Sequence, residues 1–124
     1  MVSSFQLANH VVGVMIDQNI TEEFLGEIHN IVLSKIEEFG HINFFCEVLE
    51  GNHIPFMSLM EELKFKYDNS QYIHKVAVVT NQSWLRSVMN ITDLVIQSEI
   101  KTYELSERLD AITWVSQSKH DYLG

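Results

Sequence analysis

The sequence predicts an α/β fold: a mixed, mostly parallel sheet of about five strands with about four helices, in the order ββαβαβαβα. Residues 76–79 form an unbroken apolar run, which is typical of a strand buried on both faces of a parallel sheet. Apolar residues between positions 24 and 39 recur at three- and four-residue spacing, which indicates a long helix. The first two predicted strands are too close in sequence for a crossover, so they should pair antiparallel. At 124 residues, positions 1–124 form a single domain.

The first half of the chain shows two strands and a helix. Residues 1–6 are a weak edge strand, and residues 11–16 are a second strand. Thr21 is a suitable N-cap, and Glu22 and Glu23 follow in the first helical turn, where the helix dipole favours negative charge. Gly40 should end this helix. Its apolar stripe consists of Phe24, Leu25, Ile28, Ile31, Val32, Ile36 and Phe39.

The middle of the chain predicts a strand, a loop and a second helix. Residues 42–49 are apolar on both faces, so this third strand should also be interior. Residues 51–55 have loop composition and include the single proline. Ser58 begins a capping box, and the second helix should run to about residue 67.

The last third begins with the central strand, residues 76–79. The sequence from Thr80 to Ser83 supplies turn and N-cap chemistry before a third helix that starts near Trp84. Residues 100–104 alternate and predict a last strand near an edge. Ser106 should cap a fourth helix with Leu109, Ile112 and Val115 inward and Trp114 at the flank; residues 118–124 should be a frayed tail.

Composition excludes several classes of function. Eight Lys and Arg against 17 Asp and Glu give a net charge of −9, with no run of basic residues, which argues against binding nucleic acid or an anionic membrane. Cys46 is the single cysteine, so neither an internal disulfide nor a cysteine-based zinc cluster can form. We expect no signal peptide and no integral membrane segment, and the expected compartment is the cytoplasm.

Several stretches, in order, resemble the SpoIIAA-like family, a branch of the STAS fold that is also similar to the lipid-binding CRAL-TRIO domain. Two short N-terminal stretches, 12–14 and 20–23, resemble the family's first strand and helix start. Residues 44–48 match its apolar strand with an acidic residue, and residues 61–65 (EELKF) resemble its W-E-D-L-K-F helix. Residues 75–79 with Trp84 resemble its I-A-V-V-G-D-x-x-W element, and residues 111–115 its closing helix.

The resemblance implies a binding or regulatory module, but it does not carry over a phosphorylation switch. The anti-sigma antagonists of the STAS fold carry a phosphorylated serine in an Asp-Ser-Ser/Thr-Gly loop at the second helix. Residues 51–58 lack that motif, and Ser58 is better explained as an N-cap. The chain also has His53-Ile54 and Thr80-Asn81 where many members have Gly-Trp and Gly-Asp.

No catalytic or metal motif appears, so we expect no enzyme activity, no cofactor and no metal site. The six histidines are not paired at i,i+4 and form no HExxH. No phosphate loop, GxSxG or Rossmann fingerprint occurs. Cys46 is expected to be a buried, inert thiol. Glu47 must find a partner or reach the sheet edge; it could bond the loop after its strand, or act as a polar anchor at the carboxyl end of the sheet.

Two hypotheses for function remain open. The first is a non-enzymatic module that binds an apolar or lipid-like small molecule in a cavity between the second and third helices and the sheet. The second is a STAS-type protein-interaction or regulatory module, or a homodimer, without a phosphorylation switch. The interaction module would dock the loop of residues 51–55 and the second helix onto a partner or a second copy, and a dimer could use the same methionine-bearing surface as the ligand pocket. The candidate pocket residues are Phe56, Met57, Met60, Leu63, Trp84, Val88 and Met89.

Overall fold

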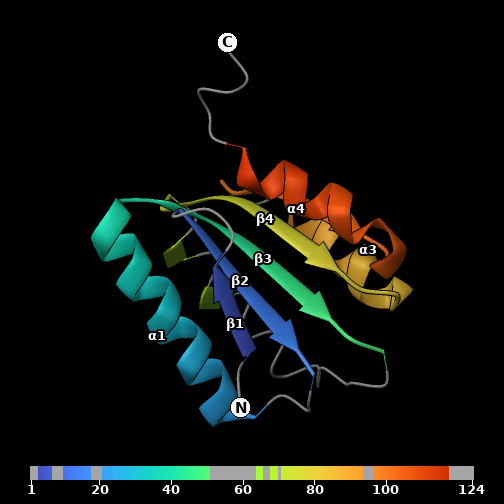
Figure 1. Ribbon diagram of the computed structural model, residues 1–124, viewed down its shortest axis with the longest axis horizontal. Coiled ribbons are helices and arrows are strands. Elements are labelled where there is room, and N and C mark those ends of the chain that lie inside the picture. The colour runs from blue at the N-terminus through green and yellow to red at the C-terminus, as the bar shows by residue number, and fades with distance from the viewer. Residues whose placement is uncertain are drawn as a thin grey trace.

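Five strands form one sheet in the spatial order β1-β2-β3-β4-β5 (Figure 1). The computed structural model describes residues 3–6, 10–17, 21–50, 64–65, 68–69, 71–93 and 97–117. The strands are β1 (Ser3–Gln6), β2 (Val11–Ile16), β3 (Ile42–Val48), β4 (Ile73–Val79) and β5 (Glu99–Tyr103). β1 pairs antiparallel with β2, and the other three pairings are parallel. The predicted mixed, mostly parallel sheet is confirmed.

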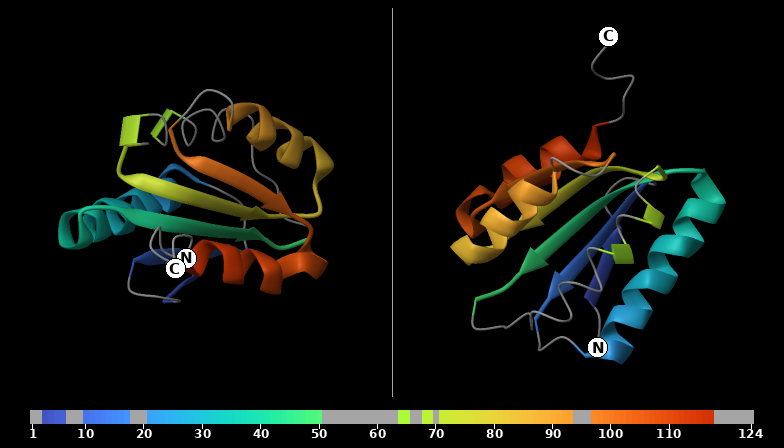
Figure 2. Two further views of the ribbon diagram at one scale, coloured as in Figure 1. Left: turned by 90° about the horizontal axis from the view of Figure 1, so that it is seen from above. Right: turned by 180° about the vertical axis from the view of Figure 1, so that it is seen from behind.

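The described helices cover both faces of this sheet. They are α1 (Glu22–Phe39), α3 (Ser83–Thr92) and α4 (Arg108–Ser116), which follows a short 3-10 turn η1 (Leu105–Glu107). α1 and α3 lie on one face and α4 lies on the other (Figure 2). Right-handed crossovers that step across the sheet in one direction place their helices on one face, which accounts for α1 and α3. The predicted second helix falls mainly outside the described residues, although positions 64–65 and 68–69 have helical backbone.

β4 is the interior strand on which both hydrophobic clusters depend. Val76 and Val78 belong to the cluster under α1 and α3, whereas Ala77 and Val79 belong to the cluster under α4. The alternation of side chains along a strand sends these pairs to opposite faces. β4 therefore has the doubly covered position that its unbroken apolar run predicts, although it begins three residues earlier, at Ile73.

α1 has the predicted ends. The Oγ1 of Thr21 accepts a hydrogen bond from the backbone N–H of Phe24 at 3.1 Å. Gly40 has a φ of 83°, and its N–H donates to the carbonyl of Ile36, so glycine is needed at this turn. The fully buried part of its stripe is Phe24, Leu25, Ile28 and Val32.

The last elements differ from the prediction in three details. β5 runs from Glu99 to Tyr103, one residue earlier than predicted. Ser106 is not the cap: Glu104 and Glu107 form a reciprocal capping box around η1. Leu109 is 76% exposed and Trp114 is buried, the reverse of the predicted orientation, because the side of α4 that packs on the sheet carries Ala111, Trp114 and Val115 at i, i+3 and i+4.

Candidate functional site

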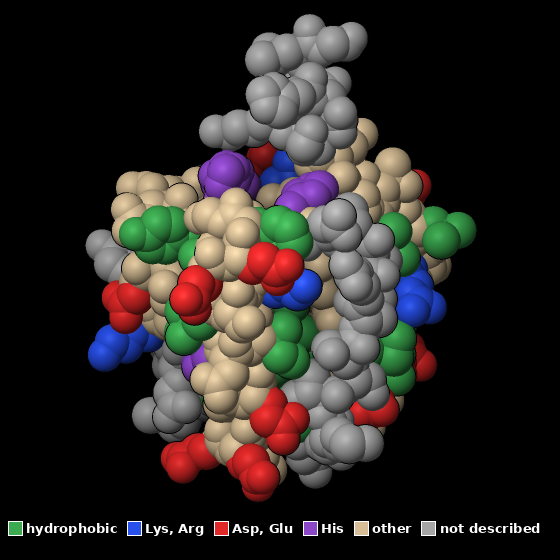
Figure 3. All heavy atoms as spheres, turned by 60° about the vertical axis from the view of Figure 1, so that its left-hand side comes forward, with side chains coloured by type: hydrophobic (Ala, Val, Ile, Leu, Met, Phe, Trp, Pro, Cys, Tyr) green, Lys and Arg blue, Asp and Glu red, His purple; other side chains and the backbone are tan. Residues whose placement is uncertain are grey.

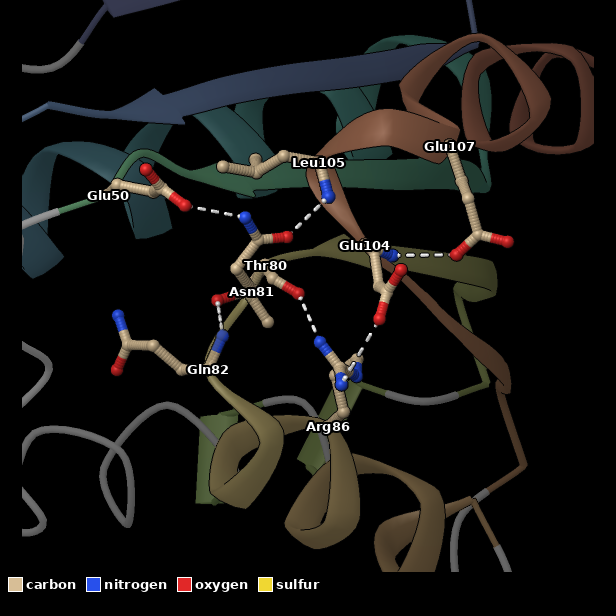
Figure 4. A network of polar contacts seen from close by, with 8 residues as sticks. All are labelled: Glu50, Thr80, Asn81, Gln82, Arg86, Glu104, Leu105 and Glu107. Carbon is tan, nitrogen blue, oxygen red and sulfur yellow. Dashed lines mark hydrogen bonds and ion pairs between the residues drawn. The ribbon is translucent and has the colours of Figure 1, made fainter.

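Polar side chains converge where β3, β4 and β5 end, at the carboxyl edge of the sheet (Figure 4). In open α/β sheets, ligands commonly bind at this edge because the loops that follow neighbouring parallel strands meet there. The segments that meet here are the residues after β3, the β4–α3 loop and the β5–η1 junction. We call this group of contacts the carboxyl-edge network; it consists of Glu50, Thr80, Asn81, Gln82, Arg86, Glu104, Leu105 and Glu107.

The side chain of Asn81 links all three segments. Its Nδ2 donates to Oε1 of Glu50 at 2.6 Å, and its Oδ1 accepts the backbone N–H of Leu105 at 2.9 Å. One amide group therefore joins the end of β3 to the end of β5 through the loop after β4. These contacts are solvent-exposed, so they orient the loops more than they stabilise the fold.

Arg86 of α3 extends the network to the strand ends. Its guanidinium donates to the carbonyl of Thr80 at 2.8 Å and lies 3.7 Å from the carboxylate of Glu104. The Oγ1 of Thr80 accepts the backbone N–H of Gln82, the N-cap residue of α3, at 3.1 Å. The predicted turn and cap chemistry at residues 80–83 is thus used within the loop, while the Gln82 side chain makes no cap hydrogen bond.

Trp84 stands beside this network with much of its ring in solvent. Its side chain is 43% exposed, and its indole N–H donates to Oε1 of Gln82 at 3.1 Å. At 100° per residue, Trp84, Val88 and Ile91 share one side of α3, which we call the apolar flank of α3. Ile91 is 66% exposed and Val88 is half-buried. The opposite side carries Asn90, whose Oδ1 accepts a hydrogen bond from Thr102 of β5.

Glu47 has a partner on α4 instead of in the loop after its strand. Its Oε1 lies 2.7 Å from Nε of Arg108, and the two side chains are 4% and 44% exposed. This ion pair offsets the burial of Oε1, which makes no hydrogen bond of regular geometry. Glu47 therefore joins β3 to the start of α4, where a negative charge also interacts favourably with the helix dipole.

A second group of buried polar contacts holds the other end of α4. Nζ of Lys75 donates to the carbonyls of Trp114 and Gln117 at 3.1 and 3.3 Å. Nδ2 of Asn43 donates to the carbonyl of Val115 at 2.8 Å. Lys75 and Asn43 thus supply hydrogen-bond donors to carbonyls at the C-terminal end of α4. The positive charge of Lys75 also interacts favourably with the helix dipole there. We call these residues, with Glu47 and Arg108, the α4 anchors.

The residues of the predicted apolar pocket fall into two groups. Phe56, Met57, Met60 and Leu63 lie outside the described residues. On α3, Met89 is buried in the core, Val88 is half-buried against it, and Trp84 is exposed. Cys46 is half-buried and packs against the same core cluster.

The sequence did not predict that two histidines, His41 and His74, lie side by side. The rings of His41 and His74 have centroids 4.2 Å apart with an interplanar angle of 43°. Linear spacing gives no sign of this pair because it depends on the pairing of β3 with β4. His29 instead stacks on Phe65, with centroids 3.8 Å apart. Among the residues that the structure describes, no three His, Cys, Asp or Glu side chains come together as a metal site.

Comparisons with known proteins agree with the fold. A sequence-family model described as SpoIIAA-like matches residues 11–116. A solved structure from Shewanella loihica PV-4, an uncharacterized protein of the DUF3478 family with a SpoIIAA-like fold, superposes with a TM-score of 0.69 at 11% identity, covering 93% of this chain and 92% of that one. No curated protein matches. Within the described residues, no helix is long and apolar enough to cross a membrane.

Proposed function

Because the chain belongs to the SpoIIAA-like family, we propose that it is a non-enzymatic binding module that docks another protein against the apolar flank of α3. A SpoIIAA-like fold is consistent with a binding or regulatory role in general. The more specific part of the proposal is the location of the docking surface, and its support is the contacts and exposure of the α3 residues.

The observation that carries the proposal is the exposure of Trp84 beside an ordered polar network. Tryptophan is enriched among the residues that dominate binding energy at protein interfaces, usually inside a polar rim. Here Gln82 satisfies the indole N–H, and the adjoining loops are held by Asn81 and Arg86. An ordered surface of this kind loses little conformational entropy when a partner binds.

α1 and α3, which lie on the same face of the sheet, differ in charge, and this difference favours α3 as the docking helix. The exposed residues of α1 include Glu22, Glu23, Glu27, Glu37 and Glu38, and Figure 3 shows acidic side chains spread over that side of the molecule. α3 has one charged residue, Arg86, which is paired with Glu104. A partner that covers α3 therefore does not have to desolvate a carboxylate of that helix.

An apolar small molecule, such as a lipid chain, is the second candidate ligand. Its support is a set of half-buried apolar side chains on the α1 and α3 face that contact the core without being enclosed by it. They are Ile31, Ile36, Cys46, Phe65 and Val88. A lipid-like molecule covering these residues would bury additional apolar area at about 25 cal/mol per Å².

Site-specific photo-cross-linking tests the docking proposal. A photoreactive amino acid at position 91 should give a discrete adduct with one partner protein or with a second copy of the chain. Position 33 on α1 is the matched control, since Leu33 is also an exposed aliphatic residue, at 45%. Adding Trp84→Ala should abolish the adduct from position 91. Equal labelling from positions 33 and 91, or an adduct that survives Trp84→Ala, would overturn the proposal.

Two further measurements separate the candidate partners. Size-exclusion chromatography with light scattering identifies a homodimer, which should become monomeric with Ile91→Asp. Native mass spectrometry and thermal shifts with fatty acids identify an apolar ligand. If a fatty acid raises the melting temperature in wild type and in Ile91→Asp alike, the ligand site is separate from the apolar flank of α3.

A further inference from the structure

The histidine pair lies at the amino edge of the sheet, at the opposite end from the carboxyl-edge network. His41 directly precedes β3, and His74 is the second residue of β4. Ile42 pairs with Ile73 and Asn43 pairs with Lys75, so the register shifts at His74, and the two imidazoles meet beside this shift with ring centroids 4.2 Å apart. Histidine side chains are visible at the top of Figure 3.

The backbone at both positions is held by its neighbours. Ile42 and Ile73 are each 1% exposed, and the N–H of Ile42 donates to the carbonyl of Tyr72 at 2.9 Å. Gly40, just before His41, is fixed by its hydrogen bond to Ile36 at 2.7 Å. The backbone that carries the two rings is therefore ordered before a metal ion binds, which lowers the entropy cost of binding.

The separation of the rings is close to the distance that a shared metal ion requires. A histidine nitrogen binds zinc at about 2.0–2.1 Å, which places two imidazole centroids on one tetrahedral ion roughly 5 Å apart. The observed centroid distance of 4.2 Å is shorter, so metal binding requires the exposed His41 ring to turn until one nitrogen of each ring faces the ion. Imidazole is a preferred ligand of Zn²⁺, Ni²⁺ and Cu²⁺ and a poor one for Mg²⁺.

We propose that His41 and His74 form a two-imidazole site for a divalent transition-metal ion. Among the residues that the structure describes, no third His, Cys, Asp or Glu joins them, so the proposal assigns two protein ligands to the ion. The net charge of −9 raises the concentration of cations near the protein. This site is independent of the docking proposal, because it lies at the other end of the sheet and uses none of the α3 residues.

Calorimetric titration of the full chain with ZnCl₂, NiCl₂ or CuCl₂ at pH 7.5 tests the site, with MgCl₂ as the cation control. We expect one equivalent of transition metal to bind, with Cu²⁺ tighter than Ni²⁺ or Zn²⁺. His41→Ala and His74→Ala should each weaken binding at least about tenfold, as expected for the loss of a ligand. His29→Ala is the matched control and should bind as wild type does.

A structural readout keeps the test decisive. Histidine ring resonances in ¹H–¹³C spectra should shift for His41 and His74 on addition of Zn²⁺ and stay unchanged for His29. If His74→Ala is unfolded by circular dichroism, His74→Gln replaces it. Binding that survives both variants, binding lost equally in His29→Ala, or the absence of any one-equivalent transition would overturn the proposal.

Discussion

The α4 anchors and the carboxyl-edge network are both polar, yet they differ in burial. Under α4, Glu47, Lys75 and Asn43 are nearly inaccessible, and their contacts replace water that burial removed. At the carboxyl edge, Asn81, Glu50 and Glu104 are exposed, so water competes for each contact. Similar polar contacts therefore contribute differently to the free energy of folding. The buried set stabilises the fold, whereas the exposed set mainly orients a surface.

The location of each set supports this division. The α4 anchors hold one helix at both ends, with a carboxylate beneath its N-terminus and an ammonium beneath its C-terminus. Both charges are favourable to the helix dipole. The carboxyl-edge network instead joins three chain segments next to Trp84, which contacts it through Gln82, so we expect its loss to change the shape of this surface more than the stability of the fold. Four predictions test this contrast, beginning with the largest effect.

Arg108→Met should cause the largest loss of stability. It leaves the carboxylate of Glu47 buried without its ion-pair partner. Breaking a fully buried pair costs about 3–5 kcal/mol, and the partial exposure of Arg108 reduces our expectation to about 2–3 kcal/mol. Urea denaturation followed by circular dichroism measures it. The double variant with Glu47→Gln should recover part of the loss; an additive double variant would mean that the pair has no coupling.

Lys75→Met should destabilise the protein by about 1.5–2 kcal/mol, because it removes a charged donor from the last carbonyls of α4 while keeping the apolar stem. Lys101→Met is the matched control. The Nζ atoms of Lys75 and Lys101 lie 5.1 and 4.9 Å from the ring centroid of Trp114, but Lys101 is exposed. Its variant should lose less than about 0.5 kcal/mol. Equal losses in the two variants would assign the effect to the tryptophan ring and not to the helix end.

Asn81→Ala should lower the free energy of unfolding by about 0.5–1 kcal/mol, because its two hydrogen bonds are exposed. Its larger effect should be local. Hydrogen exchange should accelerate at the backbone amide of Leu105, which donates to Asn81, while the amide of Lys75 in β4 keeps its protection. Unchanged exchange at Leu105 would mean that water replaces the amide without loss of order.

Trp84→Ala should have the smallest effect on stability, about 0.5 kcal/mol or less, since the ring is substantially exposed. Leu85→Ala on the buried side of the same helix is the comparison, because Leu85 is 2% exposed and its truncation should cost about 2–5 kcal/mol. Thermal and urea denaturation measure both. A loss of more than about 1.5 kcal/mol in Trp84→Ala would make this residue part of the core and weaken its proposed role in docking.

The sequence by itself determined the five strands, the three described helices and their order along the chain. The unbroken apolar run that starts at Val76 predicts an interior strand, because the run contains no polar residue that would face water. Thr21 and Gly40 mark the ends of α1 because capping depends on residues adjacent in sequence. The short connection between β1 and β2 predicts their antiparallel pairing for a similar local reason.

Tertiary structure alone decided which distant side chains meet. A carboxylate in an apolar strand needs a partner, so the sequence predicts one for Glu47. Only the packing of α4 identifies that partner as Arg108. His41 and His74 have no common spacing in sequence and meet where the pairing of β3 with β4 shifts by one residue, between Ile42 and Asn43. Burial, periodicity and capping are properties of a short segment, whereas ion pairs and ring contacts depend on the relative positions of segments that the chain order does not specify.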